Sequence, residues 1–155
     1  MAVDVAPDEH TLRILVATDS HVGFNEKDKV RGQDALNTFE EALQIGKANR
    51  ADFILHGGDL FHENKPSRKC LYRTMDLLRR YSFGPGEVNF QVVSDPAIFA
   101  RGVVNYEDPN TNVETPLFMI HGNHDDPGGD SNLAAGSLLE VAGLANCFGR
   151  SEDLE

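Results

Sequence analysis

Three short polar clusters in the 155-residue sequence contain the types of side chain that bind divalent metal ions. They are Asp19-Ser20-His21, Gly58-Asp59-Leu60-Phe61-His62 and Gly122-Asn123-His124-Asp125. Carboxylate, imidazole and amide oxygen together favour manganese, iron or zinc over an all-oxygen calcium site. The residue types therefore predict a transition-metal or zinc centre.

The spacing within the clusters is suited to two ions. Asp19 and His21 stand two residues apart, so both could turn toward one ion. Asp59 could bridge two ions, and Asn123 could offer an amide oxygen to the second. Two ions ~3.5–4 Å apart would hold a phosphate group and activate a water for in-line attack.

Each cluster follows a short apolar run typical of a buried strand, at 12–18, 52–56 and 117–120. Helical spacing predicts a helix from Asp34, as its cap, to about Asn49, and a second helix opened by Pro66-Ser67. A third helix is predicted near 132–142, with Leu138, Val141 and Ala142 facing inward. Strands that alternate with helices predict an α/β layered domain with a largely parallel sheet. Because ligands bind beyond the carboxyl ends of such strands, the three clusters should meet at one sheet edge.

Two regions fall outside this alternation. Residues 1–11 are expected to form a flexible tail, and 82–116 is expected to be an insertion, with strands possible at 88–93 and 103–106. The apolar stripe of the second helix fits either the core or a dimer interface; it consists of Leu71, Met75, Leu78 and Tyr81. His56, inside the second strand, is expected to pack in the core rather than bind a metal.

Bulk composition narrows the class of protein. A net charge of −11 is unusual for a basic nucleic-acid-binding surface but compatible with cation sites. Lys65, Arg68, Lys69 and Arg73 still cluster beside the second motif, where they could hold a DNA phosphate or form an ordinary solvated helix surface.

Two distant cysteines indicate no disulfide framework and favour a reducing compartment. No apolar run reaches the ~20 residues that span a bilayer, and the N-terminus lacks the features of a signal peptide.

The order D-x-H, G-D and G-N-H-D resembles the signature of the calcineurin-like metallophosphoesterases. Residues 14–23, 57–69 and 120–129 are similar to one branch, the eukaryotic meiotic-recombination-eleven nucleases, relatives of the bacterial SbcD subunit. Val92–Asp95, Asn105-Tyr106 and Phe148–Arg150 share this similarity, which covers nearly all of 12–150. The resemblance implies a calcineurin-like layered sandwich, of which 12–155 would be the N-terminal part only.

The resemblance also implies roles for individual residues. Two manganese ions would be bound by Asp19, His21, Asp59 and Asn123. His124 would stabilise the transition state or protonate the leaving group, and His62 would assist with the DNA end.

The implied activity is a single-strand endonuclease and 3′–5′ exonuclease of a double-strand-break repair complex in the nucleus. The implied partners are DNA, a second copy of the chain, an SMC-like ATPase subunit and a Nijmegen-breakage-type subunit, with no membrane. The helix stripe and the helix after the third cluster would form the dimer interface, and 88–115 would receive the Nijmegen-breakage-type subunit.

One departure keeps alternatives open. The family completes its metal site with later histidines, and no histidine follows His124 here. The chain could thus be a truncated, non-catalytic product that dimerises or binds partners. As written, it is expected to bind manganese weakly, show little nuclease activity and leave an apolar sheet face uncovered. A calcineurin-like protein phosphatase is less favoured, because those enzymes carry G-D-x-x-x-R-G and R-G-N-H-E.

Overall fold

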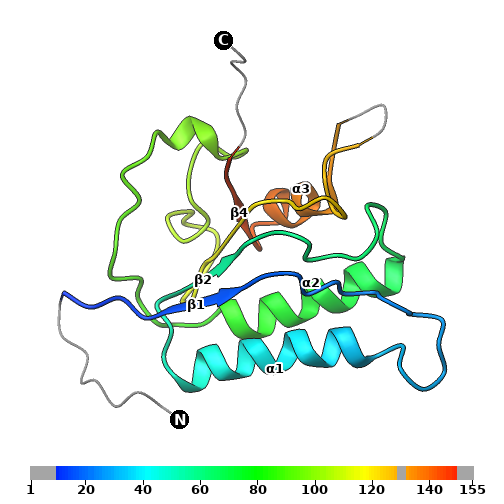
Figure 1. Ribbon diagram of the computed structural model, residues 1–155. Coiled ribbons are helices and arrows are strands. Elements are labelled where there is room, and N and C mark those ends of the chain that lie inside the picture. Colours follow the sequence, from blue (N-terminus) through cyan, green and yellow to red (C-terminus); the bar gives the residue numbers. More distant parts are fainter. Residues whose placement is uncertain (1–9, 129–131, 150–155) are drawn as a thin grey trace.

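A computed structural model describes residues 10–128 and 132–149 (Figure 1). These residues form a parallel sheet with the order β1-β2-β3-β4. The strands are β1 (Ile14–Ala17), β2 (Phe53–His56), β3 (Leu117–Met119) and β4 (Asn146–Cys147). The predicted parallel α/β arrangement is confirmed, and β4 is an additional strand that the sequence pattern did not reveal. Most of the predicted tail, 1–11, lies outside the described residues.

Three helices connect the strands, namely α1 (Asp34–Ala48), α2 (Arg68–Ser82) and α3 (Ala135–Val141). Helices α1 and α2 run side by side along the sheet (Figure 1). Ser67 caps α2, because its side chain accepts a hydrogen bond from Cys70 N at 3.0 Å. The predicted cap of α1 is wrong: Gln33 occupies the cap position, and Asp34 is the first helical residue, paired with Arg31.

One face of the sheet and all three helices share the main core. It includes Phe39, Leu43, Ile54, Leu77, Leu78, Leu117, Met119 and Leu139. The stripe predicted on α2 belongs to this core, since Leu78 is fully buried and Leu71, Met75 and Tyr81 pack against it. Core packing thus accounts for the stripe in this structure.

The predicted inward face of α3 is wrong. Leu138 and Val141 are 46% and 65% exposed, whereas Leu139 is fully buried. The helix instead buries Leu139 together with two small residues, Ala135 and Gly136, and a side chain at Gly136 would meet Met119 Cε at 3.3 Å. Apolar spacing alone favours large side chains and therefore missed this close packing.

The segment between α2 and β3 covers part of the other sheet face, and contains the short 3-10 helix η1 (Pro96–Ile98). Its apolar residues form a second cluster with the sheet, made of Phe53, Leu55, Phe90, Val92, Phe99, Val104, Tyr106, Phe118 and Phe148. The two strands predicted within it are absent. Backbone N–H of Val92 donates to the Tyr106 hydroxyl at 3.2 Å, a side-chain contact in place of a strand ladder.

This second face is only partly covered by the described residues. Val16 on β1 is 67% exposed, and a cavity of about 480 Å³ lies between the sheet and the segment. Aromatic side chains line it, among them Phe53, Phe90 and Phe118. The apolar surface expected from the sequence is present. None of the described helices is long and apolar enough to cross a membrane.

Candidate metal centre

The loops after β1 and β2 stay paired beyond the ends of the strands. His21 N donates to Asp59 O at 2.9 Å, and Val22 N donates to Leu60 O at 2.8 Å. A further hydrogen bond runs in the opposite direction between the two loops: His62 N donates to Val22 O at 3.0 Å. This continued pairing holds the first two polar clusters next to each other.

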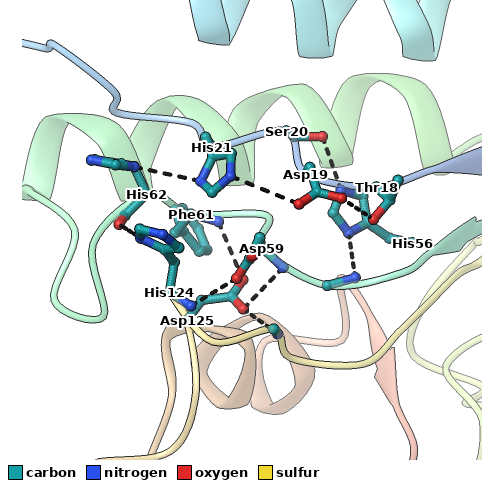
Figure 2. Close-up of polar contacts among 12 residues, drawn as sticks. Thr18, Asp19, Ser20, His21, His56, Asp59, Phe61, His62, His124 and Asp125 are labelled. Carbon is teal, nitrogen blue, oxygen red and sulfur yellow. Dashed lines mark hydrogen bonds and ion pairs between the residues drawn. The ribbon is translucent and has the colours of Figure 1, made fainter.

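Three residues of these loops have a left-handed backbone. The φ angles are 52° at Asp19, 42° at His21 and 52° at Asp59. Positive φ is uncommon for residues other than glycine, and such strain persists where surrounding contacts hold it, often at functional sites. Here the strain turns side chains of both loops toward one point, as Figure 2 shows.

The third loop is fastened to the second by a buried carboxylate. Asp125 is 1% exposed and accepts backbone hydrogen bonds from Gly122 at 2.7 Å and from Asp59 and Phe61 at 3.2 Å each (Figure 2). A carboxylate that receives three N–H donors is well satisfied despite burial. Asp125 belongs to the third polar cluster, but the sequence indicated no role for it.

Two glycines allow these loops to approach closely. Gly58 has φ of 106°, a conformation that side chains rarely adopt. A side chain at Gly122 would overlap the Asp59 carboxylate and lie 2.6 Å from Asp59 N. Gly122 is therefore required for contact between the second and third loops.

Asp19, His21 and Asp59 form a group that could hold a metal ion. One ligand atom from each lies within 4.8 Å of the others. Asp59 is 7% exposed, and its Oδ1 accepts a hydrogen bond from His124 N at 2.7 Å. Two carboxylates and an imidazole are donors suited to manganese or a similar divalent ion, so the group fits such a metal.

Two further histidines from the predicted site lie beside this group. His124 Nδ1 is 2.9 Å from the backbone oxygen of His62, and the two rings stack with centroids 4.9 Å apart. Asn123 is exposed in the same loop. The structure thus brings five predicted residues together, from three loops (Figure 2): Asp19, His21, Asp59, His62 and His124.

The basic residues predicted to contact phosphate lie outside the cluster of aspartates and histidines. Lys65, Arg68 and Lys69 are exposed around the start of α2, which follows the second loop. Arg73 is exposed one turn further along. They are accessible to a charged ligand but are not part of the cluster.

His56 is a buried residue beneath the site. Its Nε2 lies 2.9 Å from the Ser20 hydroxyl, and its Nδ1 is 3.3 Å from Gly58 N. Burial lowers the pKa of His56 to about 4, although the charges of Asp125, Asp19 and Asp59 oppose this change. The expectation that His56 packs in the core is confirmed, and its link to Ser20 is a feature that the sequence did not indicate.

Residues 12–152 match the model of the calcineurin-like phosphoesterases. The chain belongs to this family of phosphoesterases, as the order of its motifs suggested. Within it, the chain is similar to double-strand break repair proteins named MRE11. Identity is 51% to the human protein and 53% to the mouse protein, in each case over 98% of this chain and 22% of the relative. The protein of Coprinopsis cinerea is 50% identical over 96% of the chain and 21% of the relative. The chain spans about a fifth of the length of these relatives.

Proposed function

We propose that the chain is part of a manganese-dependent DNA nuclease subunit of a double-strand-break repair complex. The observation that supports this most directly is the convergence of Asp19, His21 and Asp59 within 4.8 Å at the carboxyl edge of the sheet. It occurs in a chain about half identical to MRE11 proteins. The proposed activities are single-strand endonuclease and 3′–5′ exonuclease cleavage of phosphodiesters.

The ligands divide between two ions. Asp19 and His21 would bind one ion, Asp59 would bridge both, and Asn123 would contribute to the second. Two divalent cations at this site would neutralise the phosphate oxygens and activate a water for in-line attack. A covalent intermediate on Cys70 is disfavoured, because burial raises the pKa of this thiol to about 11 and keeps it protonated.

The two other histidines act on the substrate. The His62 backbone oxygen can only accept, so Nδ1 of His124 carries a proton and donates to it. This bond fixes the ring of His124, which we assign to charge stabilisation or leaving-group protonation. His62 would contact the DNA end, and Lys65, Arg68 and Lys69 would hold neighbouring phosphates, offsetting the repulsion from a chain with net charge −11.

The proposed setting is the nucleus. The partners would be DNA, a second copy of the chain, an SMC-like ATPase subunit and a Nijmegen-breakage-type subunit. The alternative is a non-catalytic dimerising or partner-binding fragment. It is favoured by the second ion, which would have only Asp59 and Asn123 from the described residues and most of an octahedral shell from water.

A chimera tests the nuclease proposal without depending on the limits of this chain. Residues 12–149 would replace the matching segment of the mouse relative, which is 53% identical. We expect manganese-dependent cleavage of single-stranded DNA that is lost in Asp59→Asn. A folded chimera that cleaves no DNA would contradict the proposal, and cleavage confined to a phosphomonoester would favour the phosphatase reading.

Calorimetry of the 155-residue chain separates the enzyme from the non-catalytic alternative. We expect weak manganese binding with one dominant site, removed by Asp59→Asn. Two tight manganese sites would show that this chain completes the metal centre by itself. Manganese binding that is unaffected by Asp59→Asn would show that the assigned residues are not the ligands.

A further inference from the structure

Three imidazole rings from three different loops face one another beside the carboxylate group. They belong to His21, His62 and His124, all half-buried. Ring centroids are 5.4 Å apart for His21 and His62, 4.8 Å for His21 and His124, and 4.9 Å for His62 and His124. One nitrogen from each lies within 4.8 Å of the others. Figure 2 shows the three side chains grouped together.

Hydrogen bonds determine which nitrogen of His124 can bind a metal. Nδ1 donates to the backbone oxygen of His62, so Nε2 retains its lone pair. An imidazole whose other N–H donates to a carbonyl is the usual arrangement of a metal-binding histidine. His124 thus has the tautomer that a metal bond through Nε2 requires.

The two remaining rings present their Nδ1 atoms to each other. Nδ1 of His21 and Nδ1 of His62 are 3.4 Å apart, and two neutral rings can place only one proton between them. With Zn–N bonds of about 2.0–2.1 Å, two nitrogens of a tetrahedral zinc site are about 3.3–3.4 Å apart. The spacing therefore matches a cation in place of the shared proton.

We propose that His21, His62 and His124 form a zinc site that shares only His21 with the carboxylate site. Three neutral imidazoles and an open fourth position are a known zinc coordination set. Nitrogen ligands also favour zinc over manganese in the general order of divalent metal affinity, whereas Asp19 and Asp59 favour the harder ion. The planes of His62 and His124 are only 24° apart, so one of these two rings must rotate about its side-chain bonds before both can bind one ion.

His21 makes the two sites compete. A neutral imidazole has one lone pair: bound to zinc through Nδ1, His21 keeps its proton on Nε2, which lies 3.9 Å from Asp19 Oδ1. Bound to manganese through Nε2, it would keep the proton on Nδ1, facing His62. Zinc would also occupy both histidines assigned to the substrate. Zinc would thus inhibit the nuclease, a consequence that rests on the proposed function, whereas zinc binding itself does not.

Metal titrations of the metal-free 155-residue chain test the site. We expect one zinc per chain by calorimetry, three imidazole ligands by X-ray absorption at the zinc edge, and release of manganese on zinc addition, followed by electron paramagnetic resonance. His62→Gln and His124→Gln should each weaken zinc binding at least tenfold, with manganese affinity unchanged. Asp59→Asn should weaken manganese binding and leave zinc affinity unchanged. His21→Gln should weaken the binding of both metals.

His121→Gln is the matched control, because this exposed histidine is in the same loop but outside the three-histidine group. This substitution should change the affinity for neither zinc nor manganese, and thermal melts should show that all variants are folded. Zinc binding lost in Asp59→Asn but retained in His62→Gln would overturn the proposal, as would the absence of zinc binding. If manganese does not bind but zinc binding depends on the three histidines, the nuclease proposal is refuted and the zinc proposal stands.

Discussion

Nε2 of the buried His56 lies 2.9 Å from the hydroxyl of Ser20, and this contact joins the core of the sheet to the loop between Asp19 and His21. Nδ1 of the same ring lies 3.3 Å from the backbone N–H of Gly58, next to Asp59. Because an N–H can only donate, Nδ1 is the acceptor and Nε2 donates to Ser20. One imidazole thus links both loops that carry the carboxylate ligands.

This link predicts that His56 positions the metal ligands. His56→Leu should weaken manganese binding several-fold, because neither loop then has its buried partner. His56→Gln keeps a terminal N–H for Ser20 and should restore much of the affinity. The measurement is manganese affinity by calorimetry, beside unfolding in urea.

Ser20→Ala provides the control for this prediction. It should weaken manganese binding in the wild-type background and have little further effect in His56→Leu, since both changes break the same contact. Additive effects of the two substitutions on metal affinity, or a Gln variant no better than Leu, would reduce His56 to ordinary core packing.

A second prediction concerns the pH dependence of stability. The folded chain keeps His56 neutral down to a pKa of about 4, whereas the unfolded chain takes up the proton near the ordinary value of 6.5. Between these values the unfolded state binds more protons, so the free energy of unfolding falls as pH decreases from 6.5 toward 4. Above 6.5 this group contributes no slope. His56 accounts for at most about 3 kcal/mol of this decrease in the free energy of unfolding, because each pKa unit corresponds to about 1.4 kcal/mol.

Urea unfolding of wild type and His56→Leu at several pH values between 4 and 7 measures this share. The difference between the two curves isolates His56 from the carboxylates that titrate in the same range. We expect the curves to converge as the pH decreases. Parallel curves would mean that His56 takes up a proton in the folded chain at its ordinary pKa.

Asp125 gives a third prediction. Its carboxylate accepts three backbone hydrogen bonds, so Asp125→Ala leaves three N–H groups without this acceptor, and those of Asp59 and Phe61 are buried. Each unsatisfied buried group costs about 1–3 kcal/mol, so a loss of several kcal/mol in the free energy of unfolding is expected. Asp126→Ala is the matched control, because Asp126 is the exposed neighbour in the same loop. Equal effects of the two substitutions in urea unfolding would show that Asp125 does not fasten the loops.

The sequence predicted the sheet edge better than it predicted what holds it. Apolar runs located β1, β2 and β3, and the rule for parallel strands predicted that their polar ends meet. Asp125 could not be assigned, because its three donors come from backbone at 59, 61 and 122, and side-chain identity does not reveal backbone donors. The inward side of α3 was missed for a related reason: Gly136 contributes close approach, not hydrophobicity.

The final prediction separates binding from turnover at His124. Its side chain is assigned to the reacting phosphate, whereas the contact to Asp59 Oδ1 is made by its backbone N–H and survives substitution. In the chimera, His124→Asn should therefore reduce DNA cleavage ~10²–10⁴-fold, the usual contribution of an acid–base residue. Manganese affinity and DNA binding should stay near wild type, as measured by calorimetry and fluorescence anisotropy. Loss of manganese from the variant, detected by elemental analysis, would instead make His124 a ligand. Undiminished cleavage would remove it from the reaction altogether.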